Sequence, residues 1–586
     1  RLNVNKKKLL LLSVLAAIVI VALAVGLTVG LRSRDSSDNQ HARLTGAAVT
    51  SNGIECAGIG ADILRRNGSA VDAAIATLFC EGVTCPQSMG LGGGFLATIY
   101  IRDTSTAVAL DAREVAPAAA TKDMYVNQSS VQGGLAVAVP GEVKGYWELH
   151  QRYGRLEWKE LVEPTVRLCR EGHLVTGYLE RILKGREQRI RNIPTLRDVF
   201  INPATDQTWQ EGDRLKRPTL ADTLEVIARE GADALYSRNG TLLPMLMRDL
   251  KLFGSIITED DFYNYEPRWV APARTSIRKS SHVYSFPLPG SGPVLNYMLN
   301  ILDNYDELRP DDPLSWHRIV ESFKHGYGMR TRLGDPAFVP GIEDNLDKLA
   351  SKTYARYISE TIQNDRTHAE YAHYGAEFSN ERDQGTAHVS VLAPNGDAVA
   401  VTSTINSVLG AKIRSQSTGI ILNDEMDDFS TPGTVNTYGL PASPANFIAP
   451  RKIPLSSMTP SIVTDRNGAV RMVLGGAGGS RITSATAVMI YRHLVFGDDL
   501  ATIMNEKRLH HQLAPMWVDY EAGFPQTVLD GLVAKGHRVK EKTPDAGFAA
   551  ATGIVQDAAE HLVQAAYDPR RGGSHLALAR LQPVQH

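Results

Sequence analysis

The sequence predicts an α+β fold in which helices and sheets pack as layers. Helical patterns dominate the first half of the chain, strand patterns are more frequent in the second half, and no long linker, low-complexity block or internal repeat separates them. Mixed elements without a clear break are typical of a layered sandwich. Hydrophobic residues make up 43% of the 586 residues, which suits a large core and is too few for a polytopic membrane protein.

The individual elements follow from hydrophobic periodicity and from turn residues. Apolar residues at helical spacing predict one helix from Gly60 to Phe79 and further helices at 142–152, 156–171, 219–230 and 484–496. Alternating or continuous apolar runs predict strands at 95–101, 387–393, 398–404, 461–464 and 470–474.

One segment near the N-terminus differs from the rest of the chain. Residues 9–31 are an uncharged apolar run of 23 residues with basic residues on both sides. About 20 residues span a bilayer core, whereas a cleavable signal peptide has a shorter apolar stretch that ends in an A-x-A-like site, and no such site precedes Arg32. The segment is predicted to be a transmembrane signal anchor, with 1–8 as a cytoplasmic stub and 32–42 as a polar stalk. The short N-terminal side favours a single-pass type II protein of the cell membrane with an extracellular globular part.

Charge and sequons agree with that location. Lys and Arg total 62 and Asp and Glu total 64, so the net charge is −2, and the absence of a basic tract argues against a nucleic-acid partner. Three Asn-x-Ser/Thr sequons predict glycosylation at Asn67, Asn127 and Asn239.

The four cysteines are Cys56, Cys80, Cys85 and Cys169, and they leave three full pairings open. They form no C-x-x-C motif and have no zinc-like histidine spacing around them. An oxidising compartment favours at least one disulfide over four buried thiols.

Several familiar motifs fail on inspection. Residues 90–95 (GLGGGF) end in Phe where a dinucleotide fingerprint needs Gly, and they precede a strand instead of joining a strand to a helix. Residues 475–480 (GGAGGS) lack the Lys of a phosphate-binding loop, and neither G-x-S-x-G nor H-E-x-x-H occurs. The sequence therefore predicts neither a metal nor a cofactor.

The stretch from Asp383 to Thr404 carries the most information. Its two alternating runs flank Pro-Asn-Gly at 394–396, and a three-residue loop suits this tripeptide because Pro opens a type I turn and Gly takes the left-handed position. Counting outward from this loop places Thr386 directly opposite Thr404, whereas a two-residue loop would put them on opposite faces. The alternative interpretation is an ordinary cross-strand threonine pair.

Four further stretches have a functional and a structural interpretation. Residues 423–428 hold four carboxylates within five positions, which suit either a solvated turn or a cradle for an ammonium group. The hydroxyls of 456–460 could bind a ligand or only cap a turn. Residues 475–479 lie between a strand and a helix start, a place for an oxyanion hole or for tight packing. Arg113 could clamp a carboxylate or form a surface ion pair.

Taken together, these stretches resemble the γ-glutamyltransferase family, over essentially the whole chain after the stalk. The matching signatures occur in the family's order, at 60–78, 88–95, 111–117, 138–145, 385–390, 402–406, 423–429, 454–460 and 475–479.

The resemblance implies an N-terminal-nucleophile hydrolase, a four-layer αββα sandwich that matures by cutting itself between Gly385 and Thr386. The products would be a large subunit, 43–385, and a small subunit, 386–586, that remain interlocked as a heterodimer. Thr386 would then carry a hydroxyl nucleophile and a free α-amine, whose ordinary pKa of roughly 7.7–8.0 lets it act as the base. Thr404 would orient Thr386.

The resemblance also implies a pocket for the γ-glutamyl head of glutathione, its conjugates and similar amides, with water, amino acids or dipeptides as acceptors. In this pocket, Arg113 would bind the donor α-carboxylate together with Ser456 and Ser457. Glu425 and Asp428 would bind the α-ammonium group with the help of Asn406. Gly478 and Gly479 would stabilise the oxyanion.

Cys56 and Cys80 resemble a disulfide pair of the family, while Cys85 and Cys169 find no assigned partner. Two other functions remain as alternatives. A catalytically silent membrane glycoprotein on the same scaffold should have lost Thr386, the acidic pair or the Gly-Gly pair, and all are present. A related amidase or acylase with another acyl donor is disfavoured by the intact glutamyl pocket.

Overall fold

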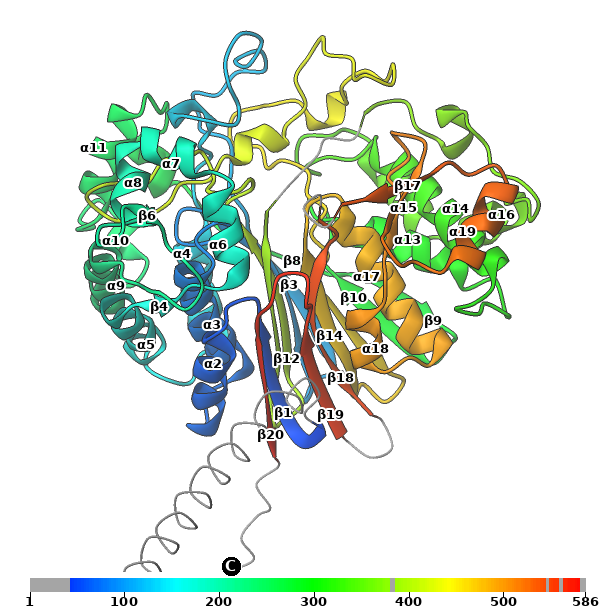
Figure 1. Ribbon diagram of the computed structural model, residues 1–586, viewed down its shortest axis with the longest axis horizontal. Coiled ribbons are helices and arrows are strands. Elements are labelled where there is room, and N and C mark those ends of the chain that lie inside the picture. Colours follow the sequence, from blue (N-terminus) through cyan, green and yellow to red (C-terminus); the bar gives the residue numbers. More distant parts are fainter. Residues whose placement is uncertain (1–42, 380–384, 544–546, 558–561, 580–586) are drawn as a thin grey trace, which may run out of the picture. The chain divides into compact units, whose positions relative to one another are not determined.

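The computed structural model describes residues 43–379, 385–543, 547–557 and 562–579 (Figure 1). The predicted anchor 9–31 and stalk 32–42 lie outside these residues. Within the described part of the chain, no helix has the length and apolar character needed to cross a membrane.

A 13-stranded antiparallel sheet runs in the order β8-β3-β2-β12-β11-β1-β19-β18-β14-β13-β10-β9, with β20 paired to β1. The predicted large and small subunits both contribute strands, in alternating groups, so each part needs the other to complete the sheet. The strand bounds are β1 (Arg43–Ser51), β2 (Gly94–Ile101), β3 (Thr106–Ala112), β8 (Arg268–Val270), β9 (Ala273–Ile277), β10 (Ser281–Ser285), β11 (Ala387–Leu392), β12 (Ala398–Thr404), β13 (Ser461–Asp465), β14 (Val470–Ala477), β18 (Ala550–Gln556), β19 (Leu562–Tyr567) and β20 (Ser574–Ala579).

The sheet folds back on itself at β1. Residues 43–45 of this strand pair with β19, while residues 48–50 pair with β11, so β1 belongs to both halves. The halves then face each other, with β11 and β12 packed against β14 and β18. A small apolar cluster fills part of this interface and consists of Leu96, Ala109, Phe286, Met458 and Ile482.

Helices cover the outer face of each half-sheet, so the layers run helix, sheet, sheet, helix (Figure 1), and the predicted α+β layering is confirmed. One side carries α2 (Cys56–Arg65), α3 (Ala70–Thr84), α4 (Glu142–Tyr153), α5 (Trp158–Glu171), α9 (Pro218–Glu230) and α11 (Leu243–Leu252). The other carries α13 (Gly292–Leu302), α14 (Pro313–Arg330), α15 (Ile342–Ala350), α16 (Lys352–Thr361), α17 (Arg481–Tyr491), α18 (Leu500–Asn505) and α19 (Gln526–Ala534).

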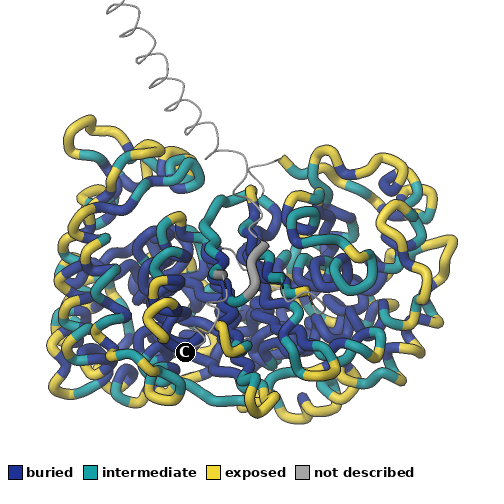
Figure 2. Tube along the Cα trace, turned by 90° about the horizontal axis from the view of Figure 1, so that it is seen from below, coloured by how far each residue is buried: buried dark blue, intermediate teal, exposed yellow. Residues whose placement is uncertain are grey.

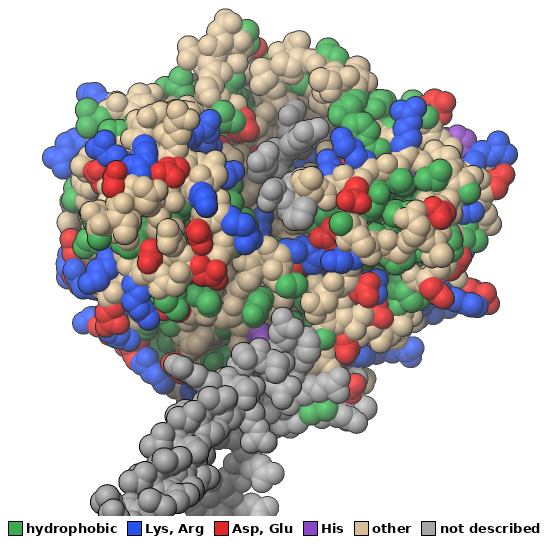
Figure 3. Space-filling model, in the orientation of Figure 1, with side chains coloured by type: hydrophobic (Ala, Val, Ile, Leu, Met, Phe, Trp, Pro, Cys, Tyr) green, Lys and Arg blue, Asp and Glu red, His purple; other side chains and the backbone are tan. Residues whose placement is uncertain are grey.

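Smaller elements complete the described chain. They are α6 (Gly177–Lys184), α7 (Glu187–Asn192), α8 (Pro194–Phe200), α10 (Asp233–Tyr236), α12 (Glu259–Tyr263) and the short strands β4 (His173–Leu174), β5 (Ile201–Asn202), β6 (Gln207–Thr208), β7 (Arg214–Leu215), β15 (Leu509–His510), β16 (Val518–Glu521) and β17 (Val539–Lys542). Figure 2 shows buried residues in the interior and exposed residues mainly at the periphery. Basic and acidic side chains are interspersed on the face in Figure 3, in keeping with the near-neutral charge.

The predicted helix from Gly60 to Phe79 is wrong as a single element, because the chain breaks it into α2 and α3. Asn67 adopts a left-handed φ of 64° between them. Ser69 then caps α3: its hydroxyl accepts a hydrogen bond from the Asp72 N–H (2.9 Å), and the Asp72 carboxylate accepts from the Ser69 N–H (2.9 Å). This reciprocal capping box starts a new helix within the apolar periodicity. The helix predicted at 484–496 begins three residues earlier, at Arg481, and ends in a π-helical turn at 492–496.

Cys56 and Cys80 form the disulfide expected from the family resemblance and link the two helices α2 and α3. Cys85 and Cys169 are buried free thiols. Burial raises the pKa of Cys169 to about 12, so this thiol stays protonated at neutral pH.

Replacing both Cys56 and Cys80 by serine should lower the free energy of unfolding by about 3 kcal/mol. The bond closes a loop with a sequence separation of 24, and a loop of this length restricts the unfolded chain by about that amount. Urea unfolding of both proteins at pH 7 measures the difference. A loss under about 1 kcal/mol would show that the disulfide contributes little to the fold.

Candidate active site

The predicted hairpin and its register are confirmed. The Ala393 N–H donates to the Asp397 carbonyl (2.9 Å), and Gly396 takes the left-handed conformation with a φ of 89°. The ladder that follows pairs β11 with β12 in the register that the three-residue loop requires. As a result, the Thr386 hydroxyl donates a hydrogen bond to Thr404 Oγ1 (3.3 Å).

The backbone around Thr386 is held in an unusual conformation. Thr386 has a φ of 83°, which is a genuine outlier for a β-branched residue, and Gly385 has a φ of 94°. Gly385 must be glycine, because a Cβ there would lie 1.8 Å from the Asn406 carbonyl oxygen. Strained backbone of this kind clusters at functional sites. Thr386 is only 4% exposed, so the hydroxyl lies in a largely dry environment.

Asn406 and its neighbours connect this hairpin to the acidic stretch. The Asn406 N–H donates to Thr404 Oγ1 (2.8 Å), so the Thr404 oxygen accepts from two sides. The Asn406 side chain donates to the Asp424 carbonyl (3.0 Å), while the Asp424 N–H donates to the Ile405 carbonyl (3.2 Å). The predicted nucleophile and the acidic stretch therefore belong to one hydrogen-bonded unit.

The interpretation of the acidic stretch as a solvated turn is wrong. Asp424, Glu425 and Asp428 are each no more than 2% exposed. Arg113 follows β3 directly and is itself 1% exposed, so it is no surface ion pair. Its Nη2 lies 2.6 Å from Glu425 Oε1 and 2.6 Å from Asp428 Oδ2. The structure thus brings the predicted carboxylate clamp and the predicted ammonium ligands into one buried cluster.

Charge is balanced by specific partners in this cluster. Burial raises the pKa of Glu425 well above its ordinary value, and the Arg113 guanidinium acts in the opposite direction. Burial also raises the pKa of Asp424, against the Lys412 ammonium, whose Nζ lies 3.0 Å from Asp424 Oδ2. A buried charge without such a partner would be costly, so the site depends on these pairings.

The segment that carries the two predicted serines contacts the same arginine at Pro454. Arg113 Nε donates to the Pro454 carbonyl (3.2 Å), which leads into the buried Ser456 and Ser457. Ser457 Oγ accepts from Arg330 Nη2 (3.1 Å) at the end of α14. Sequence reasoning missed Arg330, because nothing in the pattern of that helix marks it as close to a serine 127 positions away.

The glycine run after β14 is explained in part by packing. A Cβ at Gly475 would lie 2.3 Å from the ring of His388, and one at Gly478 would lie 2.7 Å from the Ala549 Cα. Gly478 and Gly479 both have positive φ, 139° and 61°, just before α17 begins. The oxyanion role of this pair stays a prediction, and the packing interpretation holds for Gly475.

The GLGGGF stretch, which failed as a dinucleotide fingerprint, supports the same site. A Cβ at Gly93 would lie 2.0 Å from the Thr404 carbonyl oxygen, and one at Gly92 would lie 2.1 Å from the Ile421 carbonyl oxygen. The Asn423 side chain also donates to the Gly92 carbonyl (2.8 Å). These glycines let the GLGGGF stretch lie close both to the end of β12 and to the segment before the acidic stretch.

Comparison with known proteins shows the family of this chain. The family model described as gamma-glutamyltranspeptidase matches residues 56–578. The chain belongs to the gamma-glutamyltranspeptidase family.

Relatives match the chain along almost its whole length. It is 42% identical to Scoloptoxin SSD14 of Scolopendra dehaani over 90% of this chain and 92% of that protein. It is 37% identical to Glutathione hydrolase 5 proenzyme of Mus musculus over 96% and 97%. The crystal structure of cephalosporin acylase from Bacillus halodurans superposes with a TM-score of 0.80 over 92% and 97% of the chains, and its 21% identity shows a shared fold alone.

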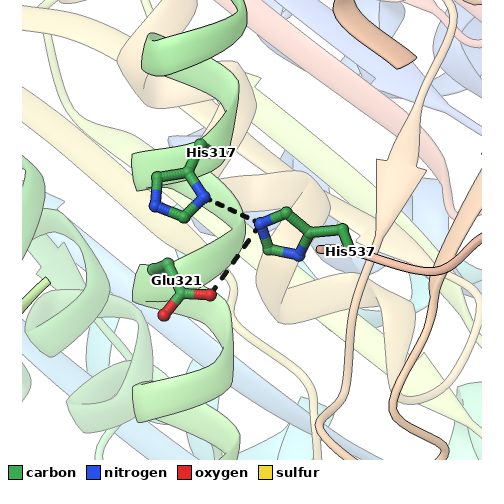
Figure 4. Close-up of side chains that lie close together, drawn as sticks. All are labelled: His317, Glu321 and His537. Atoms are coloured by element: carbon green, nitrogen blue, oxygen red, sulfur yellow. Dashed lines mark hydrogen bonds and ion pairs between the residues drawn. The ribbon is translucent and has the colours of Figure 1, made fainter. Parts of the chain in front are cut away.

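One group of described residues in this gamma-glutamyltranspeptidase chain has the composition of a metal site (Figure 4). His317 Nδ1 lies 2.8 Å from His537 Nε2, and Glu321 Oε1 lies 3.9 Å from the same Nε2. Glu321 Oε1 is also paired with the Lys324 ammonium (3.2 Å), and His317 Nε2 lies 2.7 Å from the Gln363 carbonyl. Hydrogen bonds and an ion pair satisfy this cluster, and Lys324 would repel a cation, so we interpret it as structural.

Buried neutral histidines make the fold sensitive to acid. Burial lowers the pKa of His510 to about 3, from about 6.5 in an unfolded chain. Between these values the unfolded chain binds a proton that the folded chain does not bind. His510 therefore leaves stability unchanged above pH 6.5 and lowers it as the pH falls from 6.5 towards 3.

Replacing His510 by glutamine should reduce the loss of stability on acidification. For the histidine, moving from pH 7 to pH 5 costs about 2 kcal/mol of unfolding free energy, and glutamine removes this dependence. Urea unfolding at pH 7 and pH 5 gives the change in unfolding free energy for each protein, and the prediction concerns the difference between these two changes. The control is the step from pH 7 to pH 9, where both proteins should change equally; equal changes below pH 6.5 as well would contradict the prediction.

Proposed function

We propose that the chain transfers γ-glutamyl groups from glutathione, its conjugates and other γ-glutamyl amides to water or to amino-acid and dipeptide acceptors. The reaction proceeds through an ester on Thr386. The observation that carries this proposal is the Thr386 hydroxyl, hydrogen-bonded to Thr404 and joined through Asn406 to a buried arginine–carboxylate cluster. Donation to Thr404 leaves the lone pairs of the Thr386 oxygen free to attack a carbonyl carbon.

The charged cluster suits a zwitterionic donor head. Arg113, helped by Ser456 and Ser457, binds the donor α-carboxylate, and Glu425 and Asp428, with Asn406, bind the α-ammonium group. Arg113 now pairs with the two carboxylates. When a zwitterion binds, its α-carboxylate can pair with Arg113 and its α-ammonium group can pair with the two carboxylates. The charges of the buried site therefore stay balanced when substrate binds. Gly478 and Gly479 donate to the oxyanion.

Self-cleavage at Gly385–Thr386 creates the nucleophile's own base. It frees the Thr386 α-amine, whose ordinary pKa of roughly 7.7–8.0 leaves a useful unprotonated share at neutral pH. The products are the subunits 43–385 and 386–586. Their strands alternate in one sheet, which supports a pair that stays together after the cut, within a four-layer αββα sandwich.

We further propose that residues 9–31 anchor the protein in the cell membrane with an extracellular catalytic part. The disulfide supports an oxidising compartment. Asn67, Asn127 and Asn239 are all exposed, which supports glycosylation at these sequons.

The purified full-length protein, incubated with glutathione with and without glycylglycine, tests the function. We expect glutamate and cysteinylglycine with water alone, and γ-glutamyl-glycylglycine when the acceptor is added. A preparation that contains a cut chain beginning at Thr386 but releases no cysteinylglycine would exclude this donor class.

A further inference from the structure

Arg571 contacts the peptide groups on both sides of the nucleophile. It lies in the turn between β19 and β20, far from Thr386 in sequence. Its Nη1 donates to the Thr386 carbonyl (2.9 Å) and to the Gly385 carbonyl (3.4 Å), and its Nη2 donates to the same Gly385 carbonyl (3.5 Å). The guanidinium carbon also lies over the Tyr178 ring, 5.4 Å from its centroid, within the range of a cation–π contact.

Gly385 O is the atom on which negative charge would develop during self-cleavage. We propose that Arg571 is the oxyanion-binding residue of this maturation step, a role that rests on the proposed function. Two guanidinium nitrogens face one carbonyl oxygen, and hydrogen bonds from a cation strengthen as that oxygen becomes an anion. A donor placed before the reaction needs no reorganisation when the charge appears.

The step balances without any cofactor. The Thr386 oxygen adds to the Gly385 carbonyl carbon, the C–N bond of the peptide breaks, and the hydroxyl proton ends on the Thr386 nitrogen. Water then adds to the resulting ester and gives a Gly385 carboxylic acid and a free Thr386 hydroxyl. Arg571 neither gains nor loses a proton, because its guanidinium stays charged throughout.

Maturation and turnover should depend on Arg571 to different extents. The contacts of Arg571 go to the backbone carbonyls of the chain itself, while the proposed oxyanion donors for substrate are Gly478 and Gly479. The position of Gly385 leaves little freedom, because a Cβ there would strike Asn406. Two of these hydrogen bonds go to the Gly385–Thr386 peptide bond, which no longer exists in the cut enzyme, while the hydrogen bond to the Thr386 carbonyl remains.

The experiment follows chain cleavage in purified, uncut Arg571→Gln over time on gels, with turnover measured per mole of cut chain. We expect cleavage about 10²-fold slower than in the parent, since removal of one oxyanion donor costs about 10²–10³-fold. Arg571→Lys should recover part of the rate, because lysine keeps the positive charge but lacks the planar set of N–H donors of a guanidinium. Arg181→Gln is a matched control: Arg181 also stacks over Tyr178, at 5.8 Å, and its loss should leave cleavage unchanged.

The outcomes separate this inference from the proposed function. Cleavage of Arg571→Gln at the parent rate overturns the role of Arg571 and leaves the proposed function intact. An equal loss in cleavage and in turnover per cut chain also overturns it, because the effect would then lie in the site as a whole. A parent protein that never yields a chain beginning at Thr386 overturns the proposed function itself. If the glutamine variant does not fold, Arg571→Lys decides: parent-like cleavage contradicts the inference, and slow cleavage with parent-like turnover supports it.

Discussion

Replacing Thr386 by alanine is expected to give a chain that stays uncut and hydrolyses no γ-glutamyl substrate. In the proposed mechanism, the hydroxyl that donates to Thr404 attacks the Gly385 carbonyl and, after the cut, the substrate. Its removal takes away both reactions, and loss of a nucleophile lowers turnover by about four or more decades. A gel time course and γ-glutamyl-anilide turnover measure the two effects. Thr106→Ala, at the exposed start of β3, serves as a control that should behave like the parent.

Serine at position 386 should restore both reactions in part. It keeps the hydroxyl but loses the γ-methyl group that restricts χ1. Misplacement of an attacking atom by about 1 Å can cost about 10²-fold, so slow self-cleavage and weak turnover are expected. If Thr386→Ala still matures and turns over substrate, another nucleophile performs the chemistry, and this assignment of the site is wrong.

The central hairpin could be predicted from the sequence because its register depends on local chemistry. Pro-Asn-Gly fixes the loop length, and the side-chain period of two then decides which threonines face each other. The register of β11 and β12 and the Thr386–Thr404 hydrogen bond follow from that count. Strong periodicity likewise located β2, α4 and α9 to within two residues of their ends.

Other features depend on contacts between distant segments and could not be predicted in this way. The burial of Glu425 and Asp428 depends on the contact between the acidic stretch and Arg113. The residues of the stretch by themselves do not distinguish a buried cluster from a solvated turn. Arg330 and Arg571 reach the site from a helix end and from the turn between β19 and β20, and neither place gives a local signal. The break between α2 and α3 was missed because apolar periodicity continues across the Ser69 cap.

Replacing Asp428 by alanine is expected to lower kcat/KM for γ-glutamyl donors by two or more decades. Asp428 Oδ2 lies 2.6 Å from Arg113 Nη2, and the aspartate is only 2% exposed. Removing one partner of a buried charge pair costs about 3–5 kcal/mol, because the remaining charge stays desolvated. The donor ammonium would also lose a ligand in the bound state. Turnover must be expressed per mole of cut chain, so that any slower maturation is not counted as weaker binding.

Asp427 provides a matched control within the same acidic stretch. It is partly exposed, and its carboxylate accepts a hydrogen bond from Ser130. Asp427→Ala therefore removes a carboxylate one position away without unpairing Arg113. We expect kcat/KM to change by less than about fivefold, since a partly exposed polar contact contributes about 1 kcal/mol or less. Asp428→Asn keeps the shape of the side chain and loses its charge, so a loss close to that of Asp428→Ala would assign the effect to charge. An effect under about threefold at Asp428 would mean that the acidic stretch does not bind the donor head, and that its burial serves the fold alone.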